Sequence, residues 1–188
     1  PKMAEMFTSM VEERRIDVPP ADGKRGGAFC AGVTPRVGPL QLLNYADTKR
    51  DVATLAHESG HGCHDILAYA QGQLQYHPPL TLAETASIFG EMVVFRDLLA
   101  ASKSPQERLA MLMSKVDDIV NSVVRQVSFD AFEQRVHEAR AQGEIGTADI
   151  HAMWLQVVRK FYGEEGDIFD TYAGIERLWV YVSHFHHV

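Results

Sequence analysis

The chain has 188 residues, of which 46% are apolar, and its formal net charge is −7. This length fits one domain with a normal core, and the negative charge argues against a nucleic-acid-binding surface, which needs a basic stripe. No apolar stretch approaches the roughly 20 residues that span a membrane. The two cysteines, Cys30 and Cys63, are too few for a disulfide-stapled fold, so we expect a cytoplasmic setting.

The first part of the chain predicts one helix and a small β-element. Residues 2–14 carry apolar side chains at helical spacing, and we expect this helix to end before Pro19 and Pro20. Residues 20–39 hold five glycines and short β-compatible pieces, which favour a hairpin or a pair of irregular strands. Residues 40–45 alternate weakly and are few, so a strand is expected there.

Helices are expected to follow. Thr48 and Asp51 have the spacing of a capping box, and the helix that they open is expected to close at Gly72. The later expected helices are residues 81–101, residues 105–142 with Ser128 as a candidate break point, and a helix capped by Thr147 that runs through Lys160. The predicted fold class is therefore mainly α with a small β-element near the start.

The helix after Thr48 contains an HExxH motif formed by His57, Glu58 and His61. Residues four apart share one face of a helix, so the two imidazoles can bind one cation. Glu58 lies about 100° around the helix, beside the metal, where its carboxylate can take a proton from water. A chain of this composition would contain HExxH by chance about 0.03 times, so the motif indicates a metallopeptidase.

A hydrolytic zinc site needs three protein ligands and an open fourth position. A metzincin would place the third histidine at position 67, where this chain has Leu67. A His₂Glu site instead needs a carboxylate on the following helix, and Glu84 fits this requirement. Glu91 lies seven residues later on the same face, where we expect it to orient a zinc-bound imidazole. One Zn²⁺ per chain is predicted.

The neighbours of the motif have structural explanations. His64 shares the face of the two motif histidines, but a fourth ligand would close the water position, so packing or an orienting role is favoured. Asp65 suits a solvated or supporting acid. Cys63 lies about 200° from the histidine face, which favours a buried thiol, and Cys30 suits strand packing. The remaining isolated histidines, expected in a loop or on helix surfaces, are His77, His137 and His151.

The catalysis expected of such a site has a defined division of labour. Zinc lowers the pKa of a bound water to about 7 and polarises the scissile carbonyl. Glu58 would accept the water's proton and pass it to the leaving amine. A donor for the oxyanion is also required. The C-terminal cluster His184, His186 and His187 can contain this donor, but the same spacing suits a surface tail.

Five segments spread across nearly the whole chain form a recognisable series. They are residues 23–29 (GKRGGAF), 42–45 (LLNY), 54–64 (TLAHESGHGCH), 84–91 (ETASIFGE) and 179–187 (WVYVSHFHH). In this order they resemble the oligoendopeptidase F branch of the thimet-oligopeptidase family, for which the HExGHxxH form with a downstream glutamate is highly specific.

The resemblance implies roles for particular residues. It makes His57, His61 and Glu84 the zinc ligands and Glu58 the catalytic acid and base. It also makes His184 a contact for the substrate carbonyl or the oxyanion. The implied activity is endopeptidase cleavage of short unstructured peptides in a deep channel that excludes folded proteins.

The resemblance also implies where the substrate binds and how much of the family is present. The Phe29 region and residues 40–45 would line the cleft, where a strand edge can pair with an extended peptide. Position 186 is histidine where relatives often have an aromatic residue. Residues 1–188 are expected to form a partial catalytic domain, the zincin-like core of a larger helical metallopeptidase. The family's N-terminal helical region and its tyrosine-rich C-terminal segment are expected to be absent.

Two other functions stay open at this point. A helical HExxH metallocarboxypeptidase would share the zinc geometry but trim C-terminal residues. A catalytically incompetent zinc-binding fragment would hold the metal without turnover. The segments around residues 23–29 and 42–45 favour the endopeptidase, and the oligomeric state is left open.

Overall fold

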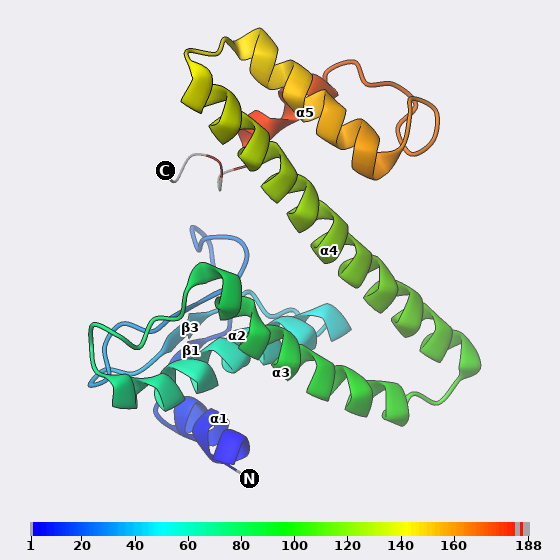
Figure 1. Cartoon of the computed structure of the whole chain (residues 1–188). Coiled ribbons are helices and arrows are strands. Elements are labelled where there is room, and N and C mark those ends of the chain that lie inside the picture. The colour runs from blue at the N-terminus through cyan, green and yellow to red at the C-terminus, as the bar shows by residue number, and fades with distance from the viewer. Residues whose placement is uncertain (1, 183–184, 186–188) are drawn as a thin grey trace. The chain divides into compact units, whose positions relative to one another are not determined.

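The computed structural model describes residues 2–182 and residue 185. The chain divides into two compact units, Pro1–Pro105 and Gln106–Val188. The prediction of a mainly helical protein with a small β-element is confirmed (Figure 1). Among the described residues, no helix is both long enough and apolar enough to cross a membrane.

The β-element of the first unit is a three-stranded sheet with the order β1-β3-β2. Its strands are β1 (Ile16–Asp17), β2 (Phe29–Ala31) and β3 (Leu40–Leu42). β3 pairs in parallel with β1 and antiparallel with β2, and Cys30 lies opposite Gln41. The strand expected at 40–45 is thus present but shorter, and β1 is an addition that two residues are too few to predict.

The expectation of paired strands within residues 20–39 is wrong, because β2 is the one strand described there and it pairs with β3. The glycine-rich stretch before β2 finds a different partner for its carbonyls. The Asn44 side-chain amide donates to the backbone oxygens of Arg25 at 2.9 Å and Gly27 at 3.1 Å. A side chain therefore satisfies backbone groups that a second strand would otherwise pair.

Helix α1 (Lys2–Glu12) ends two residues earlier than expected, and not because of the later prolines. Arg14 adopts a left-handed conformation with φ of 54°, and the Arg15 N–H donates to the Met10 carbonyl at 2.9 Å. This six-to-one hydrogen bond is typical of a Schellman motif, which stops a helix. Met6 and Met10 of α1 pack against Cys63, which confirms the buried thiol.

Helix α2 (Lys49–Ala68) carries the HExxH motif and begins as predicted. The Thr48 hydroxyl accepts a hydrogen bond from the Asp51 N–H, and the Asp51 carboxylate accepts one from the Thr48 N–H at 2.9 Å. The helix runs into a 3-10 turn, η1 (Tyr69–Gln71), and Gly72 ends it with φ of 87°. Helix α3 (Leu80–Ala101) follows and lies beside α2 (Figure 1).

The second unit contains α4, α5 and η2. Helix α4 (Pro105–Gln142) begins at Pro105 as expected and is not broken at Ser128, whose hydroxyl donates to the Arg125 carbonyl at 2.7 Å within the helix. Gly146, rather than Thr147, caps α5 (Thr147–Tyr162), because the Asp149 carboxylate accepts the Gly146 N–H at 2.9 Å. A 3-10 helix, η2 (Ile175–Tyr181), follows. The buried core of this unit comprises Phe129, Phe132, Trp154, Val157, Val158 and Tyr172.

Candidate metal centre

Three side chains from α2 and α3 direct donor atoms at one point. Glu84 Oε2 lies 3.2 Å from His57 Nε2 and 3.5 Å from His61 Nε2. One donor atom from each of the three residues lies within 4.8 Å of the others. Within residues 2–182 and 185, this is the one group of three or more histidine, cysteine and acidic residues with metal-binding geometry.

The spacing of these donors fits zinc. A tetrahedral site with bonds of about 2.0–2.1 Å holds its ligand atoms roughly 3.3 Å apart. The two distances to Glu84 Oε2 lie on either side of this value. The Glu84 side chain is 57% exposed and the two histidines are partly exposed, so water and substrate can reach the donors. Two imidazoles and a carboxylate are also a donor set that zinc prefers in hydrolases.

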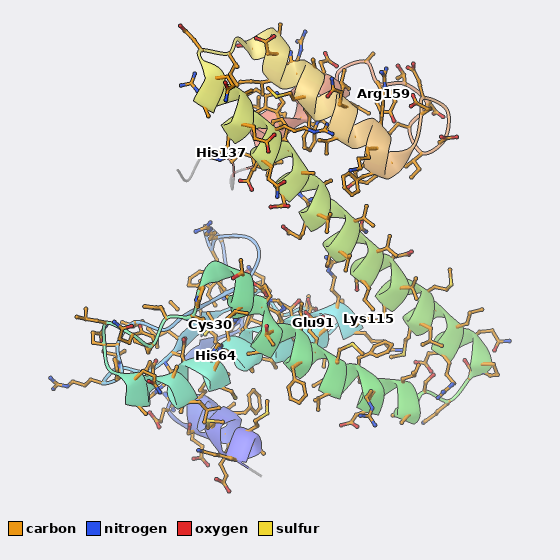
Figure 2. The ribbon with its side chains drawn as sticks, viewed as in Figure 1. Cys30, His64, Glu91, Lys115, His137 and Arg159 are labelled. Atoms are coloured by element: carbon orange, nitrogen blue, oxygen red, sulfur yellow. The ribbon has the colours of Figure 1, made fainter. Side chains whose placement is uncertain are left out.

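Glu91 lies about two turns after Glu84 in α3 and contacts the opposite side of the His57 ring. His57 Nδ1 lies 2.6 Å from Glu91 Oε1, and this hydrogen bond raises the pKa of His57. An Nδ1–H that donates to the carboxylate leaves the lone pair of Nε2 directed at the three-donor point. Figure 2 labels Glu91 on α3 and His64 on α2. The structure therefore places Glu91 where the sequence analysis expects an orienting carboxylate.

Glu58 is buried, with 6% of its surface exposed. Burial raises the pKa of its carboxyl, and the negative charges of Glu84 and Glu91 act in the same direction. A carboxylate with a raised pKa accepts a proton more readily near neutral pH, which suits a general base. Burial lowers the pKa of His61, whereas the hydrogen bond to Glu91 raises that of His57, so the two neighbouring imidazoles are shifted in opposite directions.

Two glycines allow α2 and α3 to approach closely enough for this arrangement. A Cβ atom on Gly60 would lie 2.5 Å from the Ala86 carbonyl oxygen, and one on Gly90 would lie 2.7 Å from the Ala56 carbonyl oxygen. Gly60 directly precedes His61, and Gly90 directly precedes Glu91. Backbone contact at the crossing therefore sets the distance between the histidines and the acids. The HExxH motif by itself singles out neither glycine, although each directly precedes a residue of the site.

Ser87, for which the motif alone predicts no role, is fully buried at the same crossing. Its hydroxyl lies 2.7 Å from Glu84 Oε2 and 3.0 Å from the Glu84 carbonyl oxygen. The signal available in the sequence is its place three residues after Glu84, which puts it one helical turn away.

β2 lies beside the helix that carries the motif. Burial raises the pKa of the Cys30 thiol to about 12, and the charges of Asp65 and Glu58 add to this effect. Cys30 is half-buried in β2, in agreement with the expected strand packing (Figure 2). His64 does not belong to the three-donor group.

Two of the three histidines assigned no function have the exposed setting that was expected, and the third is partly covered. His77 and His137 are exposed, and His151 is half-buried with its ring centroid 6.2 Å from that of Trp179. His184, His186 and His187 lie outside the described residues.

Peptidase family M3 matches residues 2–188 of this chain. Oligoendopeptidase F (plasmid) of Lactococcus lactis subsp. cremoris is 34% identical over 180 residues, which cover 94% of this chain and 29% of that protein. Oligopeptidase PepF of Bacillus subtilis (strain 168) is 28% identical, with 98% and 27% covered. The chain thus spans less than a third of the curated relatives it matches.

A solved structure of a peptidase from Chlamydophila abortus superposes on the whole chain with a TM-score of 0.68 at 28% identity, and the match covers 34% of that protein. The solved structure, the sequence relatives and the family match all identify the chain as part of a peptidase. The chain belongs to peptidase family M3, in its oligoendopeptidase F branch.

Proposed function

We propose that this chain is the zinc-binding catalytic core of an endopeptidase that hydrolyses short unstructured peptides. Membership of peptidase family M3 supports hydrolysis of peptide bonds. The observation that carries the zinc assignment is the position of Glu84 Oε2, 3.2 and 3.5 Å from the Nε2 atoms of His57 and His61. One zinc per chain is expected, and both units are taken as parts of one catalytic domain.

In this proposal each polar residue of the site has one task. His57, His61 and Glu84 hold the metal, and Glu91 orients the His57 ring through the Nδ1 hydrogen bond. When bound, zinc lowers the pKa of a water molecule and polarises the scissile carbonyl. Glu58, which directly follows His57 in α2, takes the proton of the attacking water and delivers it to the leaving amine.

The sheet supports a site for an extended peptide. β3 lies between β1 and β2, so both edges of β3 are paired. β1 and β2 are the two outer strands of this sheet, and β2 contains Cys30. β2 contacts α2, the helix that carries Glu58. We therefore assign peptide pairing to β2, with Phe29 at its start. The role of His184 as an oxyanion contact stays a prediction.

The zinc assignment is tested by elemental analysis of the 188-residue chain and of Glu84→Ala. About one zinc per chain, lost or much weakened in the variant, supports a His₂Glu site. No zinc in either protein after incubation with the metal at neutral pH would overturn the assignment. Equal zinc content in both would remove Glu84 from the ligand set.

The type of hydrolysis is tested with the zinc-loaded chain and an internally quenched peptide whose ends are blocked. Cleavage supports an endopeptidase, because a carboxypeptidase needs a free C-terminus. Glu58→Gln should abolish this cleavage while zinc stays bound. Zinc without cleavage of blocked or free peptides would favour the catalytically incompetent fragment. The expected cytoplasmic location stays a prediction, which cell fractionation tests.

A further inference from the structure

A buried hydroxyl contacts the carboxylate oxygen that faces both histidines. Ser87 is fully buried, and its Oγ lies 2.7 Å from Glu84 Oε2. The same Oε2 atom lies 3.2 Å from His57 Nε2. We propose that Ser87 is a positioning residue that holds the Glu84 carboxylate in its zinc-binding orientation, an inference that rests on the proposed zinc site.

Glu84 needs such an anchor because packing does little to hold it. Its side chain is 57% exposed, and a long exposed side chain samples several rotamers unless a contact selects one. The other acid of the site is held differently, since Glu91 is bound to His57 Nδ1 at 2.6 Å. Among the contacts described for the Glu84 carboxylate, the one from Ser87 is the hydrogen bond whose donor is not a proposed zinc-binding histidine.

Ser87 is itself held firmly. It lies in the close crossing of α2 and α3, where its Cα would be 2.7 Å from a Cβ on Gly60. Both acceptors near its hydroxyl belong to Glu84, the carboxylate at 2.7 Å and the backbone carbonyl at 3.0 Å. The Ser87 hydroxyl therefore donates its proton to Glu84, whichever of these two acceptors receives it.

Another serine shows what a buried helical hydroxyl does without a nearby carboxylate. Ser128 of α4 is 1% exposed and donates to the carbonyl three residues earlier, that of Arg125, at 2.7 Å. This back-bonding is common for serine within helices. At Ser87 the corresponding distance is 3.0 Å, and the shorter contact goes to the carboxylate, as expected for a charge-assisted hydrogen bond.

The test measures zinc affinity by competition with a chelator in Ser87→Ala. We expect affinity to fall by about tenfold or more, the range typical for partners that orient a metal ligand. Ser128→Ala is the matched control, because it removes an equally buried hydroxyl whose described hydrogen bond goes to a backbone carbonyl and not to a carboxylate. The zinc affinity of this control should stay within twofold of the parent's. The metal-free forms of the two variants should unfold within a few degrees of each other.

A second variant separates positioning from a general effect on the fold. If Ser87 acts through Glu84, then Ser87→Ala should cause no further loss of the weakened zinc affinity that the two histidines retain in a Glu84→Ala background. An equal loss in that background, unchanged affinity in the single variant, or failure of its metal-free form to fold would each overturn the proposal. Failure of the zinc site itself is distinguishable, because Glu84→Ala would then leave zinc binding unchanged.

Discussion

The two units bury different kinds of side chain. The core of the second unit is built from aromatic and branched residues around Phe132 and Trp154. The first unit has a smaller apolar cluster around Met10 and also buries Glu58 and Ser87 near the α2–α3 crossing. Apolar burial stabilises a fold, whereas buried polar groups are costly unless they are hydrogen-bonded. The comparison predicts that apolar packing contributes more to the stability of the second unit, whereas the first unit uses buried positions for polar groups beside its candidate donors.

The largest expected effect is on the second unit, from Phe132→Ala. Phe132 is 3% exposed and its ring centroid lies 5.1 Å from that of Trp154, so truncation should lower the free energy of unfolding by about 3–5 kcal/mol. Both tryptophans of the chain, Trp154 and Trp179, lie in this unit, so their fluorescence during urea unfolding reports it. Zinc affinity should stay within twofold.

The control for this change is Ile168→Ala, since Ile168 is 66% exposed and its loss should change stability by less than about 0.5 kcal/mol. A marked loss of zinc affinity in Phe132→Ala would show that the units do not act separately, and the comparison would fail.

Gly60→Ala should affect the metal as well as the fold. Helix propensity alone would stabilise an alanine in α2 by about 1 kcal/mol, but its Cβ would lie 2.5 Å from the Ala86 carbonyl oxygen. We expect a net loss of about 1–3 kcal/mol, measured by chemical unfolding followed by circular dichroism. Zinc affinity should fall at least tenfold, because α3 must shift and carry Glu84 with it.

Gly26→Ala is the matched control, because a Cβ there would meet nothing within 4 Å. Unchanged zinc affinity in Gly60→Ala would mean that the close helix contact does not set the position of Glu84.

Tyr69→Phe tests the attachment of β2 to the metal-binding helix. The Tyr69 hydroxyl donates to the Gly32 carbonyl at 2.7 Å, one residue after β2 ends. Its removal should lower stability by about 1 kcal/mol and raise the KM of a peptide substrate more than it lowers kcat, with zinc affinity unchanged. Tyr181→Phe, at a side chain that is 85% exposed, is the control. An unchanged KM would argue against β2 as the peptide-binding strand.

The smallest expected effect is at the capping box. Hydrogen bonds from Thr48 and Ala46 hold the pKa of Asp51 below its ordinary value of 3.8. The folded-state pKa is thus lower than the unfolded one, so this contribution is present above about pH 4 and is lost as the pH falls through the folded-state value. Asp51→Ala should lower Tm at pH 7, and the difference from the parent should narrow in acid. A difference independent of pH would contradict the assignment.

Much of the helical framework could be predicted because local chemistry decides it. Thr48 with Asp51 opens α2, Gly72 ends the turn that follows it, and Pro105 begins α4. The errors have local causes too, in groups whose partners a pattern does not reveal. At Arg14 a left-handed cap stops α1, and at Ser128 a hydroxyl satisfied within the helix leaves α4 intact.

The sequence by itself determined which residues are the candidate donors and their order along the chain. Two histidines four residues apart share a helix face whatever surrounds them, and Glu84 with Glu91 recurs on one face of the next helix. Only the tertiary structure decided how near these groups come. The distances from Glu84 Oε2 to the histidines and to Ser87 depend on where two helices cross, and backbone contact at Gly60 and Gly90 sets that crossing. Spacing within one helix is a local property, whereas contact between helices depends on the packing of both.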